Sequence, residues 1–276
     1  AKTYTNVISL REDEPLLAME PSNIAISKAK YLFFTPRIRK TGQDLKTEIN
    51  SKFKDAVGSL EKGSSIINCL ATGFGGNNEN ISLLRHVAGQ AAESISYFYF
   101  PLNDLNKTLD VIGSLKKTDE KKILTLLKTG KKEKKFVDIS SAEYSHAIDT
   151  IQRFSSLCSI LEICKEASKK NTKNTFVFND FKDLYLDDMI TGLYDLRVLG
   201  SSLEGAQTLM YLINGSIRGI HGYIKRLIDT IRITLKKNDL KASKTKIVLS
   251  WTLDANEMRG DKIEILNTIA SKLRDY

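Results

Sequence analysis

The residues with acid–base or metal-binding chemistry are few in this sequence, and their spacing is incomplete for any common catalytic site. The three histidines are His86, His146 and His221, and no serine lies in a Gly-x-Ser-x-Gly turn. Glu143 and His146 have the Glu-x-x-His spacing that places two side chains on one helix face. A di-iron site needs a second such pair and two further glutamates. We therefore predict no catalytic residues, no metal and no enzyme activity.

A glycine-rich loop and three cysteines complete the candidates for cofactor or metal chemistry. The loop Gly73-Phe74-Gly75-Gly76 lacks the third glycine of a dinucleotide fingerprint and the Gly-Lys-Ser/Thr ending of a phosphate-binding loop. We interpret it as a mobile turn. Cys158 and Cys164 are six residues apart and Cys69 is remote, whereas zinc sites need paired ligands. The sequence predicts no cofactor, and its few cysteines favour a reducing, cytoplasmic location.

The positive charge of the chain is concentrated in two short segments. The formal net charge is +9 at pH 7. Residues 116–137 hold nine lysines against three acidic side chains, and residues 216–246 hold nine basic against two acidic side chains. The remainder of the chain is slightly acidic. Clusters of cations of this kind are typical of proteins that bind a polyanion.

These basic segments supply the predicted nucleic-acid-binding residues. Several cations of the second segment would form one stripe on a helix, where they could neutralise successive phosphates. Lysine outnumbers arginine, which favours attraction to a phosphate backbone over the reading of bases. Two aromatic residues off the apolar stripe of their expected helix could stack on unpaired bases. The predicted site comprises Lys131, Lys132, Lys134, Lys135, Arg218, Lys225, Arg226, Arg232, Lys236, Lys237, Tyr97 and Tyr99.

The strongest structural signal is a long helix over about 202–237. Apolar residues recur there at alternating steps of three and four, the spacing of a heptad repeat. Such a helix is typical of the centre of a bundle, although a coiled coil between chains has the same pattern. Glycines within it indicate close contact with another helix or a bend. The seam positions are Leu203, Ala206, Met210, Ile213, Ile217, Ile220, Ile224, Leu227 and Ile231.

The rest of the chain is also read mostly as helix. Short extended segments are expected at 3–10, 30–35 and 245–253, where aromatic, β-branched or alternating apolar residues occur. Further helices are expected over about 43–60, 64–72, 84–98, 103–115, 118–129, 141–170 (with Ser141 as N-cap), 183–199 and 266–273.

The predicted fold class is therefore mainly α, a helical bundle around one long heptad-patterned helix with a few short strands. An N-terminal helical lobe with an extended arm would cover 1–130, and a C-terminal helical lobe would cover 138–276. A single domain is the alternative. No run of 18 uncharged apolar residues exists, so no membrane-spanning helix is expected.

These observations favour a non-enzymatic structural protein that packages RNA or single-stranded DNA without sequence preference. RNA is the expected partner more than DNA, and self-association suits a packaging role. Nucleoproteins and matrix proteins of RNA viruses share this general character. A peripheral scaffold or matrix-type protein on an anionic membrane is the alternative, and a helical pore-forming toxin is a weaker one. An enzyme with a site assembled from scattered residues is the weakest hypothesis.

Overall fold

The computed structural model divides into two compact units of similar size. Unit 1 comprises residues 1–36, 46–70 and 75–144, and unit 2 comprises residues 37–45, 71–74 and 145–276. The predicted lobes, 1–130 and 138–276, stay a prediction. The residues that the structure describes are 4–6, 19–36, 38–40, 44–101, 109–126, 133–169, 186–203, 205, 207–241, 244–248 and 260–274.

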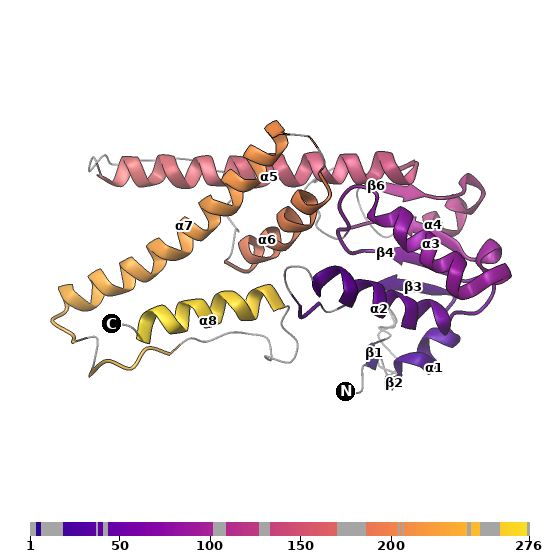
Figure 1. Ribbon diagram of the computed structural model, residues 1–276, viewed down its shortest axis with the longest axis horizontal. Helices are drawn as coiled ribbons and strands as arrows, with labels where there is room; N and C mark the ends of the chain where they lie inside the picture. Colours follow the sequence, from indigo (N-terminus) through magenta and orange to yellow (C-terminus); the bar gives the residue numbers. More distant parts are fainter. Residues whose placement is uncertain are drawn as a thin grey trace. The chain divides into compact units, whose positions relative to one another are not determined.

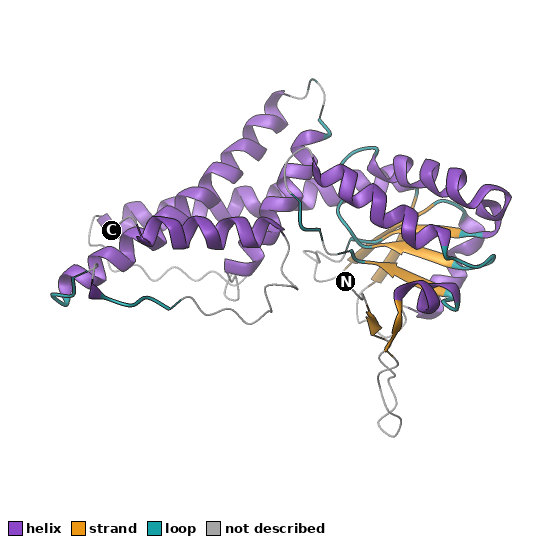
Figure 2. Ribbon diagram, turned by 60° about the horizontal axis from the view of Figure 1, so that its bottom comes forward, coloured by secondary structure: helices purple, strands orange, loops and turns teal. Residues whose placement is uncertain are grey.

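Unit 1 is built on a five-stranded sheet in the order β3-β4-β5-β6-β7 (Figures 1 and 2). The pairs β3–β4, β4–β5 and β6–β7 are parallel, and only β5–β6 is antiparallel. The strands are β3 (Tyr31–Phe34), β4 (Ser65–Asn68), β5 (Ser96–Tyr99), β6 (Leu109–Ser114) and β7 (Glu133–Val137). A separate antiparallel pair is formed by β1 (Tyr4–Asn6) and β2 (Met19–Pro21).

Helices connect the strands of the larger sheet. α2 links β3 to β4, α3 and a 3₁₀ turn link β4 to β5, and α4 lies between β6 and β7. The helices of this unit are α1 (Ser22–Ser27), α2 (Asp44–Gly58), α3 (Gly76–Ala88), η1 (Gly89–Ser94), η2 (Lys117–Asp119), α4 (Glu120–Leu126) and the first turns of α5 (Ile139–Lys169). Strand–helix–strand crossovers of this kind are what parallel pairing requires.

Both faces of the sheet are covered, and successive strand residues point to opposite faces. Ile66 and Tyr97 pack in one core with residues of α2, α3 and the start of α5, including Phe53 and Leu84. The next residue of each strand belongs to a second core, where Ile67 and Phe98 meet Ile123 of α4. The strand period of two therefore divides the apolar side chains between two layers of helices.

This sheet shows that the predicted mainly α fold class is wrong. Residues 64–72 hold β4 instead of a helix, and the helix expected over 84–98 ends at Ala88 and gives way to η1 and β5. Within the segment expected as a helix at 103–115, the described part is strand β6. These strands are short and buried on both faces, so they are apolar runs without alternation, which period alone does not separate from a buried helix.

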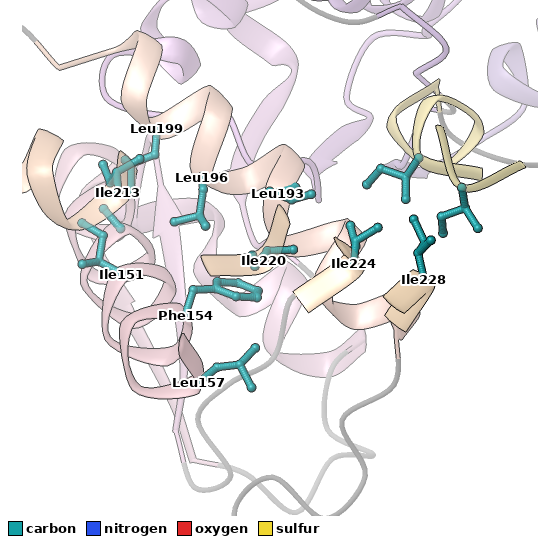
Figure 3. Close-up of a cluster of buried hydrophobic side chains, with 13 residues drawn as sticks. Ile151, Phe154, Leu157, Leu193, Leu196, Leu199, Ile213, Ile220, Ile224 and Ile228 are labelled. Atoms are coloured by element: carbon teal, nitrogen blue, oxygen red, sulfur yellow. The ribbon is translucent and has the colours of Figure 1, made fainter. Parts of the chain in front are cut away.

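Unit 2 is helical, and its core is a single apolar cluster. The cluster joins α5, α6 (Leu186–Ser201), α7 (Gln207–Lys237) and α8 (Gly260–Arg274). Figure 3 shows the side chains of α5, α6 and α7 meeting in it. Its buried members are Ala147, Ile151, Phe154, Leu157, Leu193, Leu196, Leu199, Ile213, Ile220, Ile224, Ile228, Ile265 and Ile269.

The long helix expected over 202–237 is present as α7, with a buried stripe that drifts from the heptad seam. Its fully buried residues are Ile213, Ser216, Ile220, Ile224 and Ile228, mostly at steps of four. The predicted seam residues Ile217, Leu227 and Ile231 are only partly buried. The stripe fits one helix packing on several neighbours within the unit, whereas a coiled-coil seam keeps steps of three and four.

Two further expectations concern the C-terminal part and membranes. Of the strand expected over 245–253, residues 245–248 have no strand structure and residues 249–253 lie outside the described part. No helix among the described residues is long and apolar enough to cross a membrane.

Candidate functional site

The polar side chains of unit 1 gather where β4 ends and α3 begins. The carboxyl ends of parallel strands are where open α/β sheets place their ligands. The four residues Asn68, Asn77, Asn80 and Glu143 are all at least 95% buried, and Tyr97 is 1% exposed. From the sequence, Tyr97 is expected to stack on bases, and Glu143 stands out only by its spacing to His146.

Four of these side chains are joined by hydrogen bonds into one network. The Asn68 amide Nδ2 donates to Asn77 Oδ1 at 3.0 Å, and the Tyr97 hydroxyl donates to the same oxygen at 2.7 Å. Asn80 Nδ2 donates to the Tyr97 hydroxyl at 3.3 Å. The Leu70 backbone N–H donates to Asn68 Oδ1 at 3.2 Å. The network ties the end of β4, the start of α3 and the middle of β5 together.

The carboxylate of Glu143 completes this cluster from α5. Its Oε2 accepts the backbone N–H of Gly75 at 2.8 Å. Its Oε1 accepts the backbone N–H of Asn77 at 2.9 Å and the Asn77 side-chain amide at 2.8 Å. Gly75, the N-cap of α3, has φ 75° and no side chain with which to cap the helix. Glu143 therefore takes the role that an N-cap side chain usually has.

The start of α5 is fixed against the sheet, which determines where Glu143 lies. A Cβ on Gly113 of β6 would be 2.9 Å from the Ala142 Cβ and 3.2 Å from Ile139 Cδ1, so this strand position needs glycine. Asp138 caps α5: its carboxylate accepts the Ser141 N–H at 2.9 Å and the Ser141 hydroxyl at 2.6 Å. These bonds lower the pKa of Asp138. The N-cap of α5 is thus Asp138. The expectation from the sequence, Ser141, is wrong.

The chemistry available in this cluster is that of fixed hydrogen bonds, not of proton transfer. Burial raises the pKa of the Tyr97 hydroxyl above its ordinary value, so it stays protonated. Burial likewise raises the pKa of the neighbouring Cys69 thiol to about 12, which removes the thiolate needed for a nucleophile. The part of the chain that the structure describes contains no group of three His, Cys, Asp or Glu that could hold a metal ion.

A surface hollow of about 600 Å³ lies near the amino ends of β4 and β5, opposite the polar cluster. Lys62, Gln90, Ala91, Glu93 and Ser94 line it, just before β4 and β5 begin. It is open to solvent, and it lies at the amino ends of the parallel strands. Ligands of open α/β sheets bind at the carboxyl ends, so we assign it no role.

Among the described residues of the first lysine segment, Lys116, Lys117 and Lys121 are exposed. Lys131 and Lys132 lie outside the described part. Lys134 of β7 is nearly buried, with its Nζ 3.5 Å from Asp110 Oδ2 on β6. Lys135 is exposed. Lys134 and Lys135 are neighbours on strand β7, where successive side chains point to opposite faces, so these two lysines do not share one face.

The second basic segment lies on α7, largely exposed. Arg218, Lys225, Arg232, Lys236 and Lys237 face solvent, and Arg232 is 3.6 Å from Asp229 of the same helix. Arg226 differs from them because it packs against α5. It donates to the Leu161 carbonyl at 3.3 Å and lies 3.7 Å from the Glu162 carboxylate. Arg226 therefore stabilises the contact between two helices of unit 2.

The two predicted stacking residues are inside the protein. Tyr97 and Tyr99 of β5 are 1% and 0% exposed. Both rings belong to the core between the sheet and α2, α3 and α5, so neither is available to stack on a base. The functional residue missed most clearly from the sequence is Asn77. Its position directly after the glycines Gly75 and Gly76 was the only signal that a helix begins there.

Comparisons with known proteins identify the fold. No protein-family model matches the chain, and no curated protein sequence is significantly similar to it. Among solved structures, UDP-D-ManNAc dehydrogenase from Pyrococcus horikoshii has a TM-score of 0.63 at 12% identity, covering 90% of this chain. A UDP-glucose dehydrogenase from Pyrobaculum islandicum has a TM-score of 0.55 at 10% identity over 79% of this chain. UDP-N-acetyl-mannosamine dehydrogenase from Staphylococcus aureus has a TM-score of 0.52 at 12% identity over 88%.

The chain spans about three fifths of the length of these structures, 65%, 56% and 62% respectively. At such identities the comparison shows the fold, a Rossmann-like α/β arrangement with helices, and not the activity. It overturns the predictions of an all-α nucleoprotein or viral structural protein, of no enzyme activity, and of nucleic acid or an anionic membrane as partner. The expected homo-oligomer is withdrawn as well, because it was inferred for a packaging role.

Proposed function

We propose that the protein is an enzyme of the nucleotide-sugar dehydrogenase type. In this proposal the chain binds the nucleotide-linked sugar. The observation that carries the proposal is the similarity to UDP-D-ManNAc dehydrogenase over 90% of the chain. A match of this extent includes residues of the sheet unit and of the helical unit. The substrate class is a UDP-linked sugar, and the reaction is oxidation of an alcohol carbon with a nicotinamide dinucleotide as hydride acceptor.

The described residues do not fit the pyrophosphate of such a dinucleotide. Dinucleotide-binding folds place the pyrophosphate on free backbone amides at a helix N-terminus, after a strand and a glycine-rich turn. The described residues offer one such turn, between β4 and α3, and Glu143 already accepts its Gly75 and Asn77 amides. We therefore propose that other residues of the enzyme hold the dinucleotide.

Calorimetric titration of the purified chain tests the proposal. We expect saturable binding of UDP-N-acetylmannosamine or UDP-glucose, one molecule per chain, with a dissociation constant of about 1 μM to 1 mM, the usual range for enzyme substrates. ADP serves as the matched control, because it keeps the ribose and the diphosphate but has neither the uracil nor the sugar linked to the diphosphate. Equal binding of ADP and the UDP-sugars, or no binding of either, would contradict the proposed function.

A cytoplasmic location remains part of this proposal. What supports it is the small, odd number of cysteines, of which Cys69 and Cys158 are unpaired in the structure. Burial raises the pKa of both thiols, which lowers the fraction present as reactive thiolate.

A further inference from the structure

The start of α3 has the backbone geometry of an anion site. Gly75 is in the left-handed region, with φ 75°, and the helical residues that follow direct their amides to the same side. A left-handed residue followed by right-handed ones forms a concave nest of N–H groups that binds anions. The positive end of the helix dipole adds to the attraction. In α/β proteins a ligand phosphate commonly fills such a nest.

In this protein the anion comes from the chain itself. Glu143 fills the nest with both carboxylate oxygens and receives three N–H donors, from Gly75, from Asn77 and from the Asn77 side chain. Glu143 is 5% exposed and Asn77 is fully buried, whereas the bond from the Gly75 amide is partly buried. Bonds of this kind between N–H groups and a carboxylate are stronger than neutral ones.

We infer that Glu143 is a built-in anion that permanently occupies the N-terminus of α3 and excludes any cofactor or substrate phosphate from this loop. A phosphate would have to expel the carboxylate and leave it buried without partners, which is unfavourable. The packing of Ala142 against Gly113 holds the start of α5 in place and keeps Glu143 directed at the nest. This inference stands on the contacts of unit 1 and does not depend on the proposed nucleotide-sugar activity.

Removal and replacement of the carboxylate test the inference. Glu143→Ala leaves three N–H donors without an acceptor, two of them buried, and we expect its melting temperature to fall by about 5–10 °C. Formate, a small carboxylate, is expected to restore much of that loss when compared with chloride at equal ionic strength. The wild type and Glu93→Ala, which removes an exposed carboxylate of the same unit, should show no such recovery.

A second variant and a spectroscopic titration cover the case in which Glu143→Ala does not fold. Glu143→Gln keeps the shape but turns one acceptor into a donor, so it should be less stable than the wild type and unaffected by formate. In the wild type, pyrophosphate should leave the Gly75 and Asn77 amide resonances unmoved. The inference would be overturned if Glu143→Ala were as stable as the wild type and did not respond to formate. It would also be overturned if pyrophosphate shifted those two amide resonances. Neither readout involves UDP-sugars. A failure of this inference is therefore distinguishable from a failure of the proposed function.

Discussion

Gly219 of α7 lies directly against Cys158 of α5. A Cβ built on Gly219 would be 2.6 Å from the Cys158 sulfur and 3.1 Å from its Cβ. One turn earlier, the Cys158 thiol donates to the Ser216 carbonyl at 3.4 Å. The two long helices therefore approach each other through a glycine and a small polar residue. Of the glycines in the predicted long helix, this one has the close helix contact that the sequence analysis expected.

Alanine substitutions at two glycines of α7 should distinguish the effect of helix packing on stability from the effect of helix propensity. Gly219→Ala is expected to destabilise the protein by about 1–3 kcal/mol, because the new methyl group overlaps the Cys158 side chain. Gly215→Ala, on the same helix, meets nothing within 4 Å and should stabilise by about 0.5–1 kcal/mol through helix propensity. Urea unfolding measures both. Equal effects of the two substitutions would refute the close approach.

The contact between β6 and the start of α5 gives a paired prediction. Gly113→Ala should destabilise unit 1 by about 1–3 kcal/mol, because its methyl group would lie 2.9 Å from the Ala142 Cβ. Adding Ala142→Gly removes the opposing methyl group and should recover part of the loss, beyond the cost of a helical glycine alone. A double-mutant cycle by chemical unfolding measures the coupling. Strictly additive effects would show that the two positions do not touch.

The Tyr97 hydroxyl is expected to contribute to stability and not to chemistry. Tyr97→Phe removes the donor to Asn77 Oδ1 and the acceptor for Asn80, both buried, and should cost about 1–3 kcal/mol. Tyr211→Phe is the control, because that ring is 75% exposed and the substitution should be nearly neutral. Thermal unfolding distinguishes the two. A neutral Tyr97→Phe would contradict the contribution of this hydrogen-bond network to stability.

His146 should make the protein less stable in mild acid. Burial lowers its pKa in the folded state from 6.5 to about 4, so between these values the unfolded chain binds more protons than the folded one. Stability is therefore unaffected above pH 6.5 and falls as the pH drops towards 4, by roughly 3 kcal/mol at most. His146→Gln should flatten this part of the stability–pH profile, whereas His86→Gln at an exposed site should not. A profile unchanged by His146→Gln would refute the assignment.

The helices of this protein could be predicted from sequence because their apolar period is long enough to read. α2, α5, α7 and α8 each cover at least 15 residues with a recurring apolar side, and they were found close to their actual places. β4 and β5 are four residues long and buried on both faces. Ile95 and Phe98 also fit a helical spacing by coincidence. Parallel strands of this length carry no alternation to recognise, so the fold class was lost with them.

The polar cluster could not be predicted because its bonds join residues that are distant in the chain. Glu143 and Asn77 are 66 residues apart, and no local pattern relates them. Glu143 was noticed only for its spacing to His146, which is a local relation on one helix. The concentration of basic residues in two segments is a real feature of the sequence, but the nucleic-acid packaging function inferred from it is wrong. Exposed lysines and arginines on α7 are equally compatible with a solvated helix face.

Saturation-transfer NMR of the chain with UDP-N-acetylmannosamine tests the central claim most directly. The proposed nucleotide-sugar site should transfer saturation to both the uracil and the sugar protons, and excess UDP-glucose should reduce the signal while excess ADP should not. Absence of transfer to either group, or equal competition by ADP, would contradict the assignment of this chain to nucleotide-sugar binding.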